Sequence, residues 1–349
     1  MKANRYILIV VIFAIAFYSY SQSTGLEVLD NAFKNKKSTK SLWLVNPNGG
    51  YNKNFKLPDS ISLFKNLEYL ELRNLGIIEL PESIGQLKKL KSIRIYNSEL
   101  VKLPESIGEL KNLEILYIQK SKISTLPTSI KNCKKLKELW IRESEMSAVP
   151  SSIFELKSLK LLDLYNNEIK EISHQIGKLK KLRTLYLASN NIDELPSEVL
   201  GLKKLEKLYL NNNSLKELNP FFELKRIVEV NLSMNKLEFV PEDISHCKKL
   251  TFLDLGSNKI RIIPESFRNF ESLENLRLDN NQINEISEGL FLINSLQGLW
   301  LSNNNITSFC EYINSNSALL KLVFSRNPID EEEVKCIKEK LPKCEIIFN

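Results

Sequence analysis

Cysteine and histidine are scarce in this 349-residue chain, which contains five Cys and two His. Five cysteines are too few for a scaffold held together by disulfide bonds, and two histidines nearly exclude a His-rich metal site or an elaborate proton relay. Glycine and proline number only 11 and 12, which excludes a collagen-like or low-complexity chain. Lys and Arg total 49 against 42 Asp and Glu, a formal charge of +7. The composition predicts a globular protein and leans away from an enzyme.

Catalytic and cofactor-binding motifs are also missing from the sequence. It has no H-E-x-x-H zinc motif, no phosphate-binding P-loop and no G-x-S-x-G nucleophile turn. His174 and His246 have no Cys, Ser or Asp partner at a matching spacing. The run Asn48, Gly49 and Gly50 is too short for a phosphate-binding loop and indicates a tight turn, with a binding loop as the alternative. We therefore expect no catalytic residue, no metal site and no cofactor.

The amino terminus, residues 1–21, has the composition of an export signal. It contains basic residues, an apolar run of eleven residues and two small residues before the expected cleavage at Gln22: Lys2 and Arg5, residues 7–17, Ser19 and Ser21. A membrane-spanning helix needs about 20 apolar residues, so the run favours a cleaved signal over the alternative, an uncleaved anchor.

Cleavage would leave 47 basic and 42 acidic residues, a charge of +5 that is too mild to indicate nucleic-acid binding. We expect an exported protein (periplasmic, cell-surface or secreted) with no transmembrane span after cleavage. The protein would be cytoplasmic only if residues 1–21 are not a working signal.

One short repeat runs through almost all of the remaining chain. The interval between units is 23 residues except for one of 22, where residues 219–222 replace the usual Pro-containing segment. Each unit reads L-x-x-L-x-L-x-x-N-x-I/L, commonly followed by L-P-x-x-I-x-x-L-K-K. The full units start at Leu67, Leu90, Leu113, Leu136, Leu159, Leu182, Leu205, Ile227, Leu250, Leu273, Leu296 and Leu319. A degenerate unit with Leu42 and Leu44 precedes them, so about thirteen units occupy residues 39–329.

This pattern resembles the leucine-rich repeat family. Its LP-x-x-I form is similar to the repeats of plant intracellular Ras-group-related and disease-resistance proteins and of exported bacterial proteins. The resemblance implies an α/β solenoid, a horseshoe with a parallel concave β-sheet, helical or 3-10 segments on the convex side and helical caps at both ends. The physics agrees, because alternate strand residues face opposite sides and each unit buries its leucines against its neighbours.

The family also implies a structural ladder of asparagines at the turn after each strand. The asparagines in this position are Asn167, Asn190, Asn213, Asn235, Asn258, Asn281, Asn304 and Asn327. The first four full units instead have Leu75, Ser98, Ser121 and Ser144. A serine can make part of the same hydrogen bonds, whereas a leucine makes none.

Both ends of the array are typical of caps. In the amino-terminal capping segment, residues 22–38, three apolar residues recur at helical spacing: Leu26, Leu29 and Phe33. In the carboxy-terminal cap, residues 330–349, Asp330 precedes an acidic first turn of a helix that ends before Pro342. Residues 344–348 suit a last covering strand. Little chain remains for a second, catalytic domain.

Aromatic residues recur at outward positions of the predicted concave sheet. The position between the second and third leucines contains all three tryptophans of the chain. Neighbouring strands lie about 4.8 Å apart, so this column and the one two residues later predict a contiguous patch. The predicted ligand-binding residues are Arg94, Tyr96, Tyr117, Trp140, Arg142, Tyr165, Tyr186 and Tyr209, with Trp43 and Trp300 as weaker candidates.

Two interpretations of this patch stay open. Tyrosines at this position are frequent in the family, where rings stack across strands and cover the sheet. Exposed Trp, Tyr and Arg are also the residues enriched at binding hot spots, and the tryptophan column favours this second interpretation. We therefore predict a non-enzymatic binding or scaffold module that docks a macromolecule, first a protein partner, on its concave face. A glycan or envelope polymer is the main alternative, and a membrane-anchored or intracellular signalling scaffold is another.

Lysine pairs precede successive strands, as at Lys88 and Lys89. We interpret them as a solvated edge compensated by glutamates, with a polyanion contact as the alternative.

The five cysteines can be placed from the repeat register. Cys133 and Cys247 replace core leucines and lie five units apart, so we expect them to be buried and too far from one another for a disulfide. The other three belong to the last two units or the cap. A disulfide between Cys310 and Cys336 is one option there, and we assign Cys344 to the core of the final strand.

Overall fold

The computed structural model describes residues 25–46, 55–218, 224–314 and 318–348. The predicted export signal and the turn at residues 48–50 lie outside these ranges and stay predictions. The chain divides into two compact units, Met1–Glu145 and Met146–Asn349.

In the first unit, each described repeat adds one strand to a parallel sheet. The strands are β1 (Ser41–Val45), β2 (Tyr69–Arg73), β3 (Ser92–Tyr96), β4 (Ile115–Gln119) and β5 (Glu138–Arg142). Leu42, Leu70, Ile93, Leu116 and Leu139 are successive register partners and all are buried. The 23-residue period therefore gives β2 to β5 the same phase, and β1 joins them across a longer first repeat, with the aliphatic residues facing inward.

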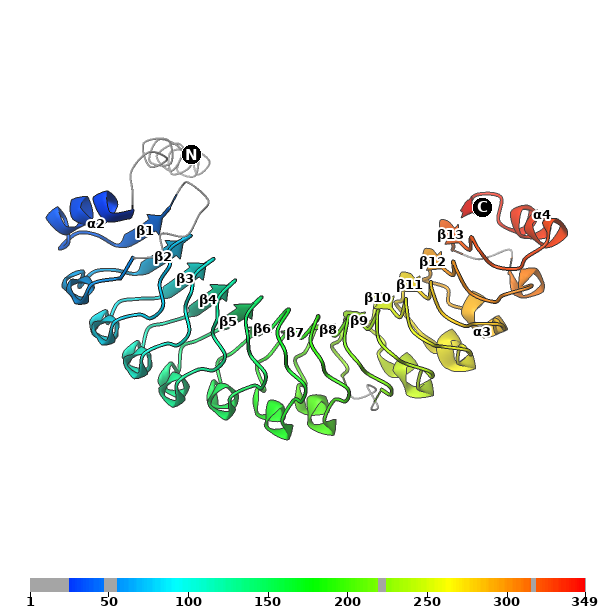
Figure 1. Cartoon of the computed structure of the whole chain (residues 1–349). Helices are drawn as coiled ribbons and strands as arrows, with labels where there is room; N and C mark the ends of the chain where they lie inside the picture. Colours follow the sequence, from blue (N-terminus) through cyan, green and yellow to red (C-terminus); the bar gives the residue numbers. More distant parts are fainter. Residues whose placement is uncertain (1–24, 47–54, 219–223, 315–317, 349) are drawn as a thin grey trace, which may run out of the picture. The chain divides into compact units, whose positions relative to one another are not determined.

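The second unit repeats this arrangement with shorter strands. They are β6 (Leu161–Asp163), β7 (Thr184–Tyr186), β8 (Lys207–Tyr209), β9 (Glu229–Asn231), β10 (Phe252–Asp254), β11 (Asn275–Arg277), β12 (Gly298–Trp300), β13 (Lys321–Val323) and β14 (Glu345–Ile347). Neighbouring strands pair in parallel from β6 to β14. In each unit, Figure 1 shows the strands on the inner side of the coil and the helical segments on the outer side.

The outer segments are mostly 3-10 helices. In the first unit these are η1 (Asp59–Leu63), η2 (Glu82–Gln86), η3 (Glu105–Glu109) and η4 (Thr128–Asn132). In the second they are η5 (Ser151–Glu155), η6 (His174–Lys178), η7 (Ser197–Gly201), η8 (Glu242–His246), η9 (Glu265–Asn269) and η10 (Cys310–Tyr312), with one short α-helix, α3 (Glu288–Phe291).

The geometry of η2 explains why these segments are tight. Pro81, just before the helix, has φ −69° and no N–H, and its carbonyl accepts a bond from Ile84 N at 3.0 Å. Leu87 N then donates to Ile84 O at 3.0 Å, and both Ile84 and Leu87 are buried. An i→i+3 coil therefore brings two apolar residues to the core within a segment of five residues.

The turn after each strand from β2 to β13 contains a residue with left-handed backbone. Twelve such residues, none of them glycine, have φ between 50° and 57°: Asn74, Asn97, Lys120, Glu143, Asn166, Ser189, Asn212, Met234, Ser257, Asn280, Asn303 and Arg326. Left-handed backbone is unfavourable for most L-residues. The surrounding hydrogen bonds must therefore hold the turn in this conformation.

Buried asparagines supply many of these bonds in the second unit. Asn190 Nδ2 donates to Leu187 O at 3.0 Å and to Leu164 O of the preceding repeat at 2.9 Å. Its Oδ1 accepts from Ile169 N at 3.0 Å. Each asparagine thus joins two repeats, and equivalent bonds recur to Asn327. In the first unit, Ser121 Oγ receives a longer bond from Ile123 N, at 3.4 Å.

Helices lie at both ends of the array, as the fold prediction required. Helix α2 (Gly25–Lys34) places Phe33 against Phe64, with ring centroids 5.0 Å apart, and buries Leu29. Helix α4 (Glu331–Lys340) begins after Asp330, whose side chain accepts from Glu333 N at 2.8 Å. The predicted α/β solenoid with a parallel sheet and helical caps is confirmed. No helix in the described residues is long and apolar enough to cross a membrane.

A disulfide joins Cys310 and Cys336, with 6.1 Å between their Cα atoms, and ties α4 to the last 3-10 segment. Cys133 and Cys247 are buried as predicted, and burial raises the pKa of their thiols to about 11 and about 12. The assignment of Cys344 to the core of the last strand is wrong. The chain turns after α4, Cys344 N donates to Leu341 O at 3.1 Å, and Leu341 is buried while Cys344 is half-exposed.

Candidate binding surface

Three rings lie next to one another on the outward face of the first unit's sheet. They belong to Tyr96 on β3, Tyr117 on β4 and Trp140 on β5, and we call them the ring cluster. The centroids of Tyr96 and Tyr117 are 4.8 Å apart, and those of Tyr117 and Trp140 are 5.6 Å apart. All three side chains are partly exposed. The parallel register produces the cluster, because it pairs Tyr117 directly with Trp140.

Arginines contact both ends of the ring cluster. The guanidinium of Arg73 lies 4.4 Å from the centroid of Tyr96, and that of Arg142 lies 5.9 Å from Trp140. Arg73 also binds Glu71 through Nη2 at 2.8 Å. A cation over an aromatic face contributes roughly 0.5–2 kcal/mol, so these contacts help to hold the rings in one arrangement.

Polar bonds fix the same rings from the side. Tyr117 Oη donates to Gln119 Oε1 at 2.7 Å, and Gln119 Nε2 donates to Glu143 Oε1 at 2.5 Å. Trp140 Nε1 donates to Glu138 Oε2 at 3.3 Å. Burial raises the pKa of Tyr96, with Glu71 acting in the same direction. The hydrogen bonds hold the ring cluster in one conformation in the unbound protein. Such preorganisation lowers the entropy cost of binding.

The second unit has a pair of stacked rings on its own strands. Tyr186 and Tyr209 have centroids 4.5 Å apart and planes only 12° apart. Tyr209 Oη donates to Glu229, which also binds Lys207 Nζ at 2.6 Å. Burial, together with the hydrogen bond to Glu229, raises the pKa of Tyr209. A carboxylate, that of Glu229, therefore lies beside this pair.

The remaining predicted residues lie on the same strand face of their own units. Tyr165 follows β6 and is partly exposed, and Trp43 on β1 pairs in register with Glu71. Arg94 on β3 is exposed and pairs in register with Tyr117. Within the first unit Tyr96, Tyr117 and Trp140 contact one another, and within the second unit Tyr186 contacts Tyr209.

Trp300 lies flat against the sheet of the second unit. A Cβ atom added to Gly298 would come within 2.6 Å of the indole, so only glycine leaves room for this orientation. The guanidinium of Arg277 is 5.8 Å from the ring centroid and binds Asp279 at 3.3 Å. The result is a flat aromatic surface with polar neighbours.

Two acids in the predicted outward column are instead buried. Asp163 is 1% and Asp254 is 8% exposed, because each carboxylate turns back to the backbone two residues later. Asp163 Oδ1 accepts from Tyr165 N at 2.9 Å, and Asp254 Oδ1 accepts from Gly256 N at 3.0 Å. Asn231 makes the same bond to Ser233 N at 3.0 Å. The tendency of Asp and Asn to bond their own backbone is the sequence signal for this arrangement.

Asp254→Asn should stabilise the protein near neutral pH. Burial raises the pKa of Asp254, although the Gly256 N–H opposes that shift. Because the pKa of this carboxyl is higher in the folded protein than in the unfolded chain, its ionisation favours the unfolded chain. Stability is therefore lost as the pH rises through the pKa of the unfolded chain and then through that of the folded protein. Asparagine keeps the acceptor without the charge, so the advantage of the variant should grow between about pH 3 and pH 7. Urea unfolding at both pH values measures it. Exposed Asp193→Asn is the control, and an equal gain there would contradict the explanation.

Some of the lysines that precede the strands bind glutamates. Lys88 binds Glu109 at 2.7 Å, and Lys248 binds Glu271 at 3.2 Å. Others donate to asparagines instead, as Lys89 does to Asn66 Oδ1 at 2.6 Å. Exposed pairs of this kind contribute little to stability.

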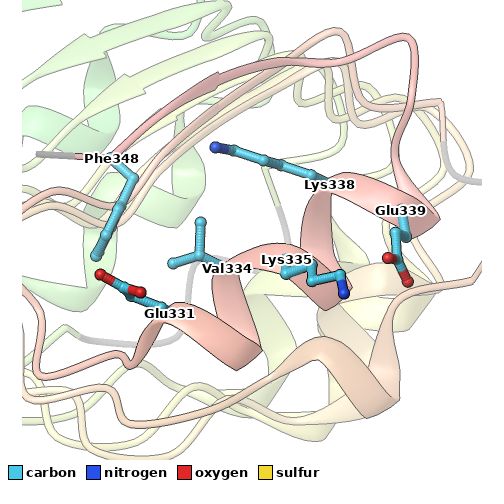
Figure 2. A pocket seen from close by; sticks show the side chains of 6 residues that line it. All are labelled: Glu331, Val334, Lys335, Lys338, Glu339 and Phe348. Atoms are coloured by element: carbon cyan, nitrogen blue, oxygen red, sulfur yellow. The ribbon is translucent and has the colours of Figure 1, made fainter.

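A pocket of about 540 Å³ lies at the carboxy-terminal cap. Figure 2 shows the side chains of Val334 and Phe348 on its walls, with Glu331 beside Phe348. Lys335, Lys338 and Glu339 from α4 complete the lining. Acidic and basic side chains are thus mixed around apolar atoms. Over the described ranges, no group of three His, Cys, Asp or Glu residues could hold a metal ion.

Family comparisons agree with the repeat pattern. A family model described as a leucine-rich repeat region matches residues 50–158 and 146–227, and one described as a leucine rich repeat matches residues 203–260 and 225–283. The chain belongs to the leucine-rich repeat family. No curated protein matches its sequence as a relative.

Solved structures of similar fold include bacterial and plant proteins. A leucine-rich repeat protein of Leptospira interrogans is 29% identical with a TM-score of 0.72, and the match covers 92% of this chain and 98% of that one. An internalin of Listeria monocytogenes is 22% identical with a TM-score of 0.74, over 90% and 88% of the two chains. The plant peptide hormone receptor RGFR1, solved in complex with RGF2, is 23% identical with a TM-score of 0.64, over 90% and 62%.

Proposed function

We propose that the protein is a non-enzymatic binding module that docks a protein partner on the outward face of its sheet. The observation that carries the proposal is the ring cluster of Tyr96, Tyr117 and Trp140, which is partly exposed and held by Arg73 and Arg142. Aromatic and arginine side chains dominate binding energy because they offer a large rigid area with polar ends.

The comparisons support a protein as the partner. RGFR1 was solved with RGF2 bound, and a similar fold with a TM-score of 0.75 occurs in the Drosophila complex of Toll with Spatzle. Repeat scaffolds of this kind accept unrelated partners on one architecture, so the partner's chemistry must come from the side chains of this chain.

A glycan is the second candidate ligand, and Trp300 is the observation that favours it. A sugar ring stacks on a flat aromatic face flanked by hydrogen-bonding groups, and Trp300 with Arg277 and Asp279 provides such a face. The ring cluster offers a larger aromatic area, so we place the protein partner first.

Two observations support export of the protein. Residues 1–21 have the composition of a cleaved signal. The Cys310–Cys336 disulfide suits an oxidising compartment, because disulfides are rare in the cytosol. An intracellular scaffold is disfavoured for the same reasons.

Trp140→Ala should weaken partner binding about 30-fold or more, the usual loss when a hot-spot ring is removed. The protein is used as bait in an envelope fraction, captured proteins are identified, and their affinities for the variant are measured. Phe239→Ala in the second unit, which removes a ring that is 67% exposed, is the control and should bind normally. Equal affinity for Trp140→Ala, in a variant that melts like the parent, would refute the proposed docking site.

A further inference from the structure

The side chain of Arg94 is the unpaired cation beside the ring cluster. It is exposed on β3 and makes no hydrogen bond or ion pair with any residue in the described ranges. The other charged groups nearby are engaged. Arg73 is bound to Glu71, while Glu138 accepts a bond from Trp140. An exposed guanidinium in this position is available to a ligand.

The register explains why Arg94 has no partner within its own sheet. Its neighbours on the two adjacent strands are Glu71 and Tyr117. Glu71 is the carboxylate that pairs with Arg94 in register. Its Oε1 accepts from both Arg73 Nη2 at 2.8 Å and Arg73 Nε at 3.2 Å, and Arg73 in turn lies over Tyr96. Glu71 is therefore directed to Arg73 and forms no ion pair with Arg94.

The surroundings strengthen an ion pair formed at Arg94. Tyr117 pairs with it in register, and Tyr96 lies two residues further along the same strand. A partner covering these rings would exclude water, and a charge pair gains strength as the local dielectric constant falls. The guanidinium fork matches a carboxylate with two parallel hydrogen bonds.

We propose that Arg94 binds an Asp or Glu side chain in an extended segment of the partner protein, next to apolar side chains that rest on the ring cluster. This inference rests on the proposed docking function. A side chain fits better than a chain terminus, because contact surface continues on both sides of Arg94, toward Tyr69 on one side and Trp140 on the other. A polyanion fits poorly, because such ligands need several free cations and Arg73 is already paired.

Synthetic peptides test the inference without a known partner. The full protein is measured against a random array of ten-residue peptides, and each bound peptide is compared with a copy in which Asn or Gln replaces every Asp or Glu. We expect the acidic form to bind about tenfold more tightly. Arg94→Gln should abolish this preference, and Arg94→Glu should reverse it toward peptides containing Lys or Arg. Lys131→Gln, which removes an exposed charge from η4 on the other side of the same unit, should keep it.

The outcomes separate this inference from the proposed function. Binding that depends on Trp140 but is equal for both peptide series, or a preference that survives Arg94→Gln, overturns the inference alone. Binding unaffected by Trp140→Ala overturns the docking site itself. Absence of peptide binding in both series overturns this inference, whereas the docking site is judged by the effect of Trp140→Ala on the captured proteins.

Discussion

Asn190→Ala should lower the free energy of unfolding of the second unit by about 3 kcal/mol or more. The Asn190 amide donates to Leu164 O and Leu187 O and accepts from Ile169 N, and the residue is 7% exposed. Alanine would leave these buried backbone groups without a partner, at a cost of about 1–3 kcal/mol each. The loss also weakens contact between adjacent repeats, which is the source of stability in a solenoid.

Asn191 provides the matched control, because it is the adjacent asparagine and its side chain is exposed. Asn191→Ala should change stability by less than about 0.5 kcal/mol. Urea unfolding followed by circular dichroism compares the two variants. If both variants unfold at the same urea concentration as the parent protein, the asparagine side chains do not hold the turns. Our explanation of the left-handed backbone would then be wrong.

Removing the disulfide, as in Cys310→Ser combined with Cys336→Ser, should destabilise the carboxy-terminal cap by about 3 kcal/mol. The bond joins residues 26 positions apart, and a closed loop of this length restricts the unfolded chain by roughly that amount. The cap also depends on Glu333, whose carboxylate accepts from Phe309 N and Cys310 N at 2.5 Å. Opening the loop should therefore loosen these bonds and expose Ile337, which is fully buried.

Amide hydrogen exchange in α4 and the adjoining η10 measures this effect, with and without a reducing agent. Cys344→Ser, which alters a free half-exposed thiol, should leave the exchange unchanged. Exchange in α4 that is insensitive to reduction would contradict a role for the disulfide in holding the cap.

The repeat period was enough to predict the strands, their phase and their buried residues. Leu162 and Leu185 pair because each occupies the same position in a unit of 23 residues, and the same logic places Tyr117 beside Trp140. Stacking then follows from strand spacing alone. The columns of outward residues are therefore readable without coordinates.

Side-chain interactions that differ from one repeat to the next could not be predicted from the repeat period. The column rule treats every outward position alike, but Asp254 folds back to Gly256 N and is buried. The assignment of Cys344 failed because the repeat ends at the cap, where α4 and not the period sets the path of the chain. Arg94 has no ion-pair partner among the described residues, and Glu71 binds Arg73 instead. The spacing of the repeats could not predict which of the two arginines Glu71 would bind.

The left-handed turns have a consequence for how the protein can diversify. Their conformation is imposed by bonds from neighbouring coils, so the side chain at the bend does not need to favour it. Lysine, glutamate, methionine and arginine all occur there beside asparagine and serine, and none of these side chains is buried. Single substitutions at these turn positions can therefore change the side chains along the edge of the sheet without changing the backbone conformation.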